Sequence, residues 1–157
     1  MNPKFPSDTV AGMFKTAVVS NYMFDSARFD HQRFNWNLKD FDRYSSAFAF
    51  GLVENGFRQG DKVVLWLDQE NSAEILTAQM GAAKAGVSVV LFSEKDNKDA
   101  FHQVLKDSSA RGVIFSPSTQ VNEEGVTRQS ILQSLMPELE SLYPGDAINC
   151  SAYPNLK

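Results

Sequence analysis

The chain has 157 residues, 43% hydrophobic and 22% charged, a composition typical of one folded domain and outside the range of disordered segments. Its formal net charge is −4 and its basic residues form no long run, which argues against nucleic acid as a partner. No apolar run reaches the length of a transmembrane helix and the amino terminus lacks a secretory signal, so we expect an intracellular protein that does not span a membrane.

A first amphipathic helix is predicted up to about Phe24, with Ser7 as its cap. Its predicted buried face consists of apolar residues at three- and four-residue spacing: Val10, Met13, Phe14, Ala17 and Val18. After a polar link, the letters RFNW at 33–36 predict a short strand. Asn37 then caps a second helix, with Asp40 at the capping-box position.

The second helix is predicted to stop at Gly56, with Phe57 making the hydrophobic contact of a glycine stop. Its two faces are predicted to hold Leu38, Phe41, Phe48 and Leu52 on the apolar side, and Asp42, Arg43 and Glu54 on the polar side. Phe50 falls on the polar face, so we expect its ring to be exposed to solvent.

Short apolar strands alternate with single helices over the rest of the chain. The predicted elements are a strand at 62–67, a helix from Asn71 or Ser72 to Gly86, a strand at 87–92, a helix at 98–107, a strand at 112–116 and a helix at 127–143 broken near Pro137. This alternation predicts an α/β fold, a short parallel sheet of βαβ units that is buried on both faces and flanked by helices.

The order of these features resembles the amino-terminal segment of the adenylate-forming enzymes, in particular the acyl-CoA synthetase group with an AMP-binding domain. Members open with an aromatic strand before a helix, a Gly-x-x-x-Gly-Asp-x-Val turn, an asparagine before the next helix, and a Gly-Ala-x-x-Ala-Gly helix end. The corresponding residues here are 34–36, Gly56, Gly60, Asp61, Val63, Asn71 and 81–86. The resemblance covers most of residues 10–118 and is weaker toward its end.

The resemblance implies a single truncated domain over 1–157, with an N-terminal helix and link at 1–33, a βαβ core at 34–118, and a loop, helix and tail at 119–157. In the family, ATP is bound by a Ser/Thr/Gly-rich loop ending in Pro-Lys that lies further along the chain. Such a loop is not found in these 157 residues. We therefore predict that the chain holds no catalytic residue, no cofactor-binding residue and no metal ligand, and that it needs no cofactor.

Local candidates for a site have simpler explanations. The hydroxyl-rich segment at 116–120 has neither a glycine nor a following lysine, so we interpret it as a surface loop. Asp68, Glu70 and Glu94 follow predicted strands, where open α/β sheets bind ligands, but three acids would repel a phosphate, and we expect structural or solvated roles.

The remaining reactive residue types also give no site. His31 and His102 have no ligand spacing to carboxylates, and we expect solvent-facing or capping roles for them. Cys150 is the only cysteine, which excludes an internal disulfide, and no histidine lies near it in sequence, so we expect an inert thiol.

The aromatic residues are concentrated at the front of the chain, where 11 of the 18 lie within the first 50 positions. A sheet that stops here would also leave an edge and an apolar surface uncovered. We therefore predict a non-catalytic accessory subunit of a larger protein assembly, with other protein subunits as partners. Alternatively, the front helices fold back and bury these aromatic rings within the chain. The tail is expected either to cap the sheet of its own chain or to lie on a neighbouring protein.

Two further functions stay open at this point. The chain is alternatively the N-terminal piece of an active ATP-dependent, AMP-forming acyl-CoA ligase, an acid–thiol ligase whose missing segments are supplied separately. A weaker option is a stand-alone binder of nucleotide or acyl-CoA. By analogy with fatty-acid-activating relatives, we favour the mitochondrion over the cytoplasm as its location.

Overall fold

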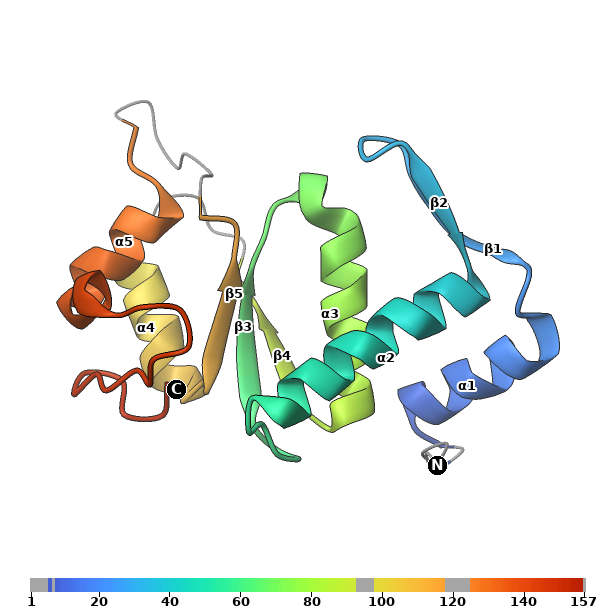
Figure 1. Ribbon diagram of the computed structural model, residues 1–157, viewed down its shortest axis with the longest axis horizontal. Coiled ribbons are helices and arrows are strands. Elements are labelled where there is room, and N and C mark those ends of the chain that lie inside the picture. The colour runs from blue at the N-terminus through green and yellow to red at the C-terminus, as the bar shows by residue number, and fades with distance from the viewer. Residues whose placement is uncertain (1–5, 7, 93–97, 118–124, 157) are drawn as a thin grey trace. The chain divides into compact units, whose positions relative to one another are not determined.

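The computed structural model describes residues 6, 8–92, 98–117 and 125–156 (Figure 1). The chain divides into two compact units. The first, here the helical unit, comprises Met1–Gly60 and Gln69–Ser88, and the second, here the sheet unit, comprises Asp61–Asp68 and Val89–Lys157. The subdivision into 1–33, 34–118 and 119–157 stays a prediction.

The helical unit begins with α1 (Val10–Asn21), which ends earlier than predicted. The cap is Thr9, whose side chain accepts a hydrogen bond from the Gly12 amide at 3.1 Å, rather than Ser7, which lies outside the described residues. The predicted buried face of this helix is also wrong in part, because Val10 and Met13 are each 64% exposed whereas Val18 is buried.

A β-hairpin follows, made of β1 (Asp25–Phe29) and β2 (Phe34–Asn37), which pair antiparallel with Phe29 opposite Phe34. Strand β2 agrees with the prediction, whereas β1 forms in a segment that we expected to be a polar link. One face of the hairpin is apolar: Phe29 and Trp36 are buried with their ring centroids 4.7 Å apart, and they pack with Ala73.

Helix α2 (Leu38–Glu54) has the predicted cap and the predicted stop. The Asn37 side chain accepts a hydrogen bond from the Asp40 amide at 2.9 Å, and Gly56 adopts a positive φ of 82° just beyond the helix end. Phe50 is 63% exposed, as its position on the polar face predicts.

Helix α3 (Ser72–Ala85), preceded by the short 3₁₀ helix η1 (Gln69–Asn71), packs against α2 in the same unit. Their close approach requires Gly81, because a Cβ atom there would lie 2.7 Å from both Phe48 Cδ1 and the Ser45 carbonyl oxygen. The helix ends at Gly86 with a φ of 73°, as predicted.

The sheet unit is built on three strands in the order β4-β3-β5, namely β3 (Lys62–Trp66), β4 (Ser88–Leu91) and β5 (Gly112–Phe115). Strands β3 and β5 are parallel, with Val64 opposite Val113. The predicted α/β fold with a short parallel sheet is confirmed. Burial on both faces holds only for β3, whose four residues from Val63 onward are at most 1% exposed, since β4 and β5 are partly exposed outer strands.

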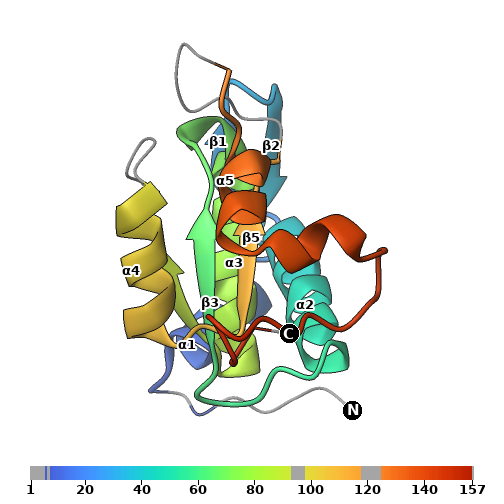
Figure 2. The same cartoon turned by 90° about the vertical axis from the view of Figure 1, so that its left-hand side faces the viewer.

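Helices α4 (Lys98–Ser108) and α5 (Arg128–Leu135) lie on one face of this sheet (Figure 2). Helix α5 ends before Pro137, and the 3₁₀ helix η2 (Pro137–Ser141) follows, so the predicted break is confirmed. The core between sheet and helices contains Val64 and Trp66 from β3, Phe101 and Leu105 from α4, and Ile131 and Leu132 from α5.

The carboxy-terminal tail belongs to the same core. Cys150, Tyr153 and Leu156 are each 4% exposed and pack into the cluster formed by β3, α4 and α5. Of the two positions that the sequence left open for the tail, the structure has it covering the sheet unit of its own chain.

Candidate functional site

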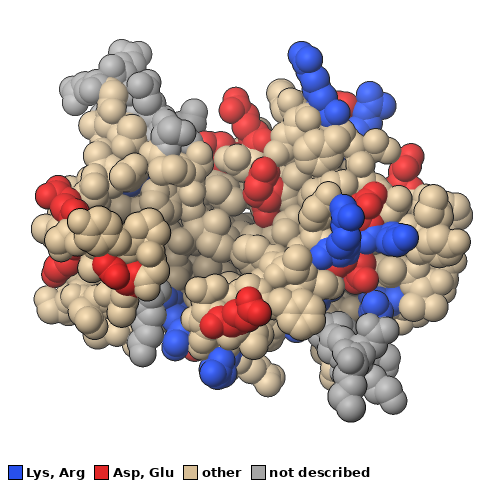
Figure 3. All heavy atoms as spheres, in the orientation of Figure 1, with Lys and Arg blue, Asp and Glu red and all other residues tan. Residues whose placement is uncertain are grey.

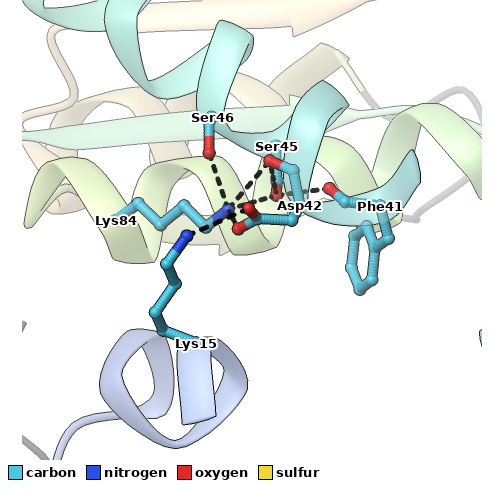
Figure 4. A network of polar contacts seen from close by, with 6 residues as sticks. All are labelled: Lys15, Phe41, Asp42, Ser45, Ser46 and Lys84. Carbon is cyan, nitrogen blue, oxygen red and sulfur yellow. Dashed lines mark hydrogen bonds and ion pairs between the residues drawn. The ribbon is translucent and has the colours of Figure 1, made fainter. Parts of the chain in front are cut away.

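The most developed polar cluster lies in the helical unit, around the side chain of Lys84 on α3 (Figure 4). Its ammonium group donates hydrogen bonds to Asp42 Oδ1 at 2.8 Å, Ser45 Oγ at 2.7 Å and Ser46 Oγ at 2.9 Å, all on α2. From α1, Lys15 Nζ reaches the other carboxylate oxygen of Asp42 at 3.3 Å. The cluster therefore connects three helices.

Burial and charge shift the pKa values of both central groups. Burial lowers the pKa of Lys84, whose side chain is 2% exposed, although the Asp42 carboxylate opposes the shift. Burial alone would raise the pKa of Asp42, but hydrogen bonds and charges from Lys84 and Lys15 outweigh it and lower that pKa. The lowered pKa keeps the Asp42 carboxylate charged at neutral pH, next to the Lys84 ammonium group.

Catalytic lysines are typically buried and have a lowered pKa, so it matters whether Lys84 has an unused N–H donor. An ammonium group has three N–H donors. In Lys84 the Asp42 backbone oxygen at 3.1 Å adds a fourth acceptor to the three side-chain oxygens, so no donor is left for a ligand. The arrangement fits a structural cross-link between helices.

Asp42 lies on the side of α2 that the sequence predicts to be polar, but that side packs against another helix. The Asp42 side chain is 20% exposed and pairs with Lys84, which lies 42 positions further along the chain. Helical periodicity gives the angular position of a side chain but does not show that another helix places a cation opposite it.

A second non-local contact lies where α3 begins. Asn71 occupies the cap position, as predicted, but its side chain makes no capping hydrogen bond. Instead, Gln32 in the hairpin turn accepts a hydrogen bond from the Ala73 amide at 3.2 Å and donates one to the Glu74 carboxylate at 2.8 Å. The hairpin turn therefore supplies the helix cap.

In the sheet unit, Asp68 follows β3 and forms an ion pair with Arg128 at the start of α5. The Arg128 guanidinium also lies over the ring of Trp66, 5.3 Å from its centroid. The expected structural role of Asp68 agrees with this pairing, whereas no sequence pattern singled out Arg128. Glu70 is exposed, and Glu94 lies outside the described residues.

The histidines and the cysteine occupy different environments. His31 is exposed, as expected. His102 is half-buried and its Nδ1 lies 2.5 Å from the Tyr153 hydroxyl, a contact that the sequence did not predict. The Cys150 thiol is free and buried. Burial raises the pKa of Tyr153, and the neighbouring Cys150 adds to the shift.

Within the ranges that the structure describes, no group of three or more His, Cys, Asp or Glu residues has the arrangement of a metal site. An open hollow follows the β1–β2 hairpin, and its four charged lining residues are two acids and two arginines: Asp25, Asp30, Arg28 and Arg33. Residues 118–120 of the predicted surface loop lie outside the described part. The absence of catalytic, cofactor-binding and metal-ligating residues stays a prediction.

Charged side chains show no continuous patch of one sign on the face shown in Figure 3, where the basic side chains of the described residues lie singly or beside acidic ones. Such a face has no basic stripe of the kind that binds nucleic acid. None of the helices in the described part of the chain is long and apolar enough to cross a bilayer.

The sequence model of the AMP-binding enzyme family matches residues 11–152. The chain belongs to the AMP-binding enzyme family. Among individual relatives, the Bacillus subtilis (strain 168) protein YngI, named as a putative acyl-CoA synthetase, is 29% identical over 133 residues. The mitochondrial medium-chain acyl-CoA ligase ACSF2 of Rattus norvegicus is 25% identical over 126 residues.

The chain spans only part of these family members. The matches cover 85% and 80% of this chain but 23% of YngI and 19% of the rat ligase. Solved structures confirm the fold: a Mycobacterium tuberculosis fatty acyl CoA synthetase superimposes with a TM-score of 0.68 at 18% identity, over 87% of this chain and 25% of that one. The N-terminal domain of FACL13 from the same organism gives a TM-score of 0.66 at 19% identity, over 90% and 38%.

Proposed function

We propose that this chain forms the opening part of the N-terminal domain of an acid–thiol ligase of the acyl-CoA synthetase group, and that its own residues supply scaffold and not chemistry. One observation carries the proposal. Lys84 and Asp42 are the side chains of the helical unit best suited to catalysis, and they are hydrogen-bonded to each other. Lys84 also donates to hydroxyl groups of α2, so none of its N–H donors is left for a ligand.

The relatives support the reaction class. YngI and the rat protein are named as an acyl-CoA synthetase and an acyl-CoA ligase. Enzymes of this kind activate a carboxylic acid with ATP, form an acyl-adenylate and pass the acyl group to a thiol. In this proposal the ATP-binding and acyl-transfer groups come from polypeptide that these 157 residues do not contain.

An ATP–pyrophosphate exchange assay tests this function. The chain alone is expected to give no exchange, and the chain together with polypeptide that purifies with it natively is expected to give acid-dependent exchange. In that complex, Gly81→Ala should lower exchange by disturbing the packing of α2 on α3, whereas Glu70→Gln and His31→Asn should leave it within about twofold. Acid-dependent exchange by the isolated 157 residues would refute the scaffold role.

A second function is favoured by the exposed apolar side chains of the helical unit. Among the described residues of this unit, six are more than 60% exposed: Val10, Met13, Val19, Met23, Phe24 and Phe50. A non-catalytic accessory subunit would bury such side chains against other protein subunits of an assembly. Native purification followed by mass spectrometry distinguishes the two functions, because a ligase remainder supports the first and unrelated subunits without exchange activity support the second.

The proposed location is intracellular, with the mitochondrion favoured over the cytoplasm. The support is the name of the rat relative, which is a mitochondrial ligase. Fractionation of cells that express the chain with a carboxy-terminal tag tests this location. Recovery of the tag in the cytosolic fraction alone would refute the mitochondrial location.

A further inference from the structure

A buried arginine stands at the start of α5, in the sheet unit. The Arg128 side chain is 6% exposed, and its guanidinium lies over the Trp66 ring at the carboxyl end of β3. Asp68, which follows β3, is 39% exposed and contributes the carboxylate of the ion pair. The carboxyl ends of parallel strands are where open α/β sheets place their ligands.

Arg128 does not use all of its donors. Its Nη2 donates to Asp68 Oδ1, whereas Nε and Nη1 are buried and have no hydrogen-bond partner among the residues that the structure describes. A buried N–H group without a partner is destabilising, and more so when the group is charged. Two such nitrogens on one guanidinium therefore mark a position that is not saturated by the protein.

The unused nitrogens have a geometric meaning. In a guanidinium, Nε–H and one N–H of Nη2 point from the same edge, so a carboxylate or phosphate can accept from both at once. Asp68 occupies Nη2, and Nε has no acceptor within the described part of the chain. An incoming oxyanion that displaced Asp68 could accept from the whole edge, while the Trp66 ring continued to support one face of the guanidinium.

We propose that Arg128 binds a small oxyanion, a carboxylate or a phosphate, at the carboxyl end of β3, with Asp68 as an exchangeable internal substitute for that anion. The partial exposure of Asp68 gives the anion its route to an otherwise buried cation. The positive end of the α5 dipole adds to the attraction. The amides of Thr127 and Ser130 are used in a capping box, so the guanidinium and not the helix end provides the site.

The site does not depend on the ligase function proposed above, because it rests on contacts of Arg128, Asp68 and Trp66 alone. It also refines our interpretation of the acids near the strand ends. Asp68 by itself would repel a phosphate, but with Arg128 beside it the same carboxylate becomes a competitor for the anion's position.

The test is a titration of the ¹⁵N-labelled chain with inorganic phosphate and, separately, with acetate, followed through the arginine Nε–H resonances. We expect a saturable shift of the Arg128 Nε–H resonance with at least one of the two anions, and which one responds identifies the preferred oxyanion. Asp68→Asn removes the competing carboxylate and is expected to tighten binding by about tenfold or more. A merely structural ion pair predicts no gain in binding from that change.

Arg128→Met keeps a long apolar side chain on the Trp66 ring and is expected to abolish the saturable response. If that variant does not fold, Arg128→Lys retains the charge without the planar edge and should weaken binding by about tenfold. The matched control is Arg111→Met. Arg111 forms an ion pair with Asp61, and both residues precede the amino ends of the strands, away from the proposed site, so anion binding should be unchanged. No saturable shift in either the parent or Asp68→Asn, or unchanged binding in the Arg128 variant that folds, would overturn the proposal.

Discussion

Replacing Asp42 by asparagine removes one negative charge from the cluster around Lys84 while nearly preserving the shape of the side chain. The Lys84 ammonium would keep the Ser45 and Ser46 hydroxyls but lose the carboxylate that forms its ion pair within the described part of the chain. Lys15, which now pairs with the same carboxylate at 3.3 Å, would remain as a like charge. The variant therefore buries the Lys84 cation without the negative charge that now compensates it.

The expected effect is large because the Lys84 side chain is 2% exposed. Removing one partner of a buried ion pair lowers the free energy of unfolding by about 3 kcal/mol. For a chain of this size each kcal/mol changes Tm by roughly 2–4 °C, so Tm should fall by about 6–12 °C. Joint replacement of Lys84 by Met and Asp42 by Leu should recover most of that loss, since no charge is then buried.

The pH dependence has a definite sign. The pKa of Lys84 is lower in the native protein than the ordinary value of 10.5, so the unfolded chain binds this proton more tightly. Between the native and the unfolded pKa, the contribution of Lys84 to the free energy of unfolding therefore increases with pH. An asparagine in place of Asp42 would no longer oppose the lowering, which makes the increase steeper in the variant. The deficit of Asp42→Asn relative to the parent should therefore be smaller at about pH 9.5 than at about pH 7.

Urea unfolding followed by circular dichroism at the two pH values measures both effects. The control is Asp30→Asn, which removes the acid of an ion pair with Arg28 whose side chains are 82% and 78% exposed, and which should change the free energy of unfolding by no more than about 1 kcal/mol. If Asp42→Asn is no more destabilising than this control, or if its deficit grows with pH, the charge-burial reasoning is wrong.

Four further substitutions test three other contacts, each by urea unfolding. Gly81→Ala should lower stability by about 1–3 kcal/mol through steric overlap, whereas Gly51→Ala, with nothing within 4 Å of the new Cβ, should raise it by up to about 1 kcal/mol; equal effects would contradict the packing argument. Gln32→Ala should remove the α3 cap at a loss of about 1 kcal/mol, and no loss would mean that the cap is dispensable. Tyr153→Phe should remove the hydrogen bond to His102 and lower stability by about 1 kcal/mol, and an unchanged stability would show that this bond contributes nothing.

The elements with strong local signals were predictable from sequence. Asn37 has a cap-forming side chain directly before an apolar pattern, and Gly56 and Gly86 provide the positive φ that ends a helix, so α2 and α3 lie close to where we expected them. Strand β1 was missed because its sequence DSARF has only one buried residue, Phe29. A strand held mainly by pairing with its neighbour carries little hydrophobic alternation.

The candidate sites depend on contacts that no local pattern records. Gln32 caps a helix that begins 40 positions later, and Lys84 turns a polar-face aspartate into a buried partner. Arg128 opens a short helix, where an exposed side chain is the usual expectation, yet the Trp66 ring buries it. Sequence reasoning assigns faces to single elements, and these residues acquire their roles from elements distant in the chain.

Because the tail is packed into the sheet unit, the reactivity of the chain's only thiol reports how often the tail detaches. Cys150 is 4% exposed and shares its cluster with Tyr153 and Leu156, so a thiol reagent reaches the sulfur only in molecules whose tail has lifted. The ratio of its labelling rate to that of a fully exposed thiol then equals the fraction of time the tail spends open. The open fraction of the tail can be measured in this way without any substitution.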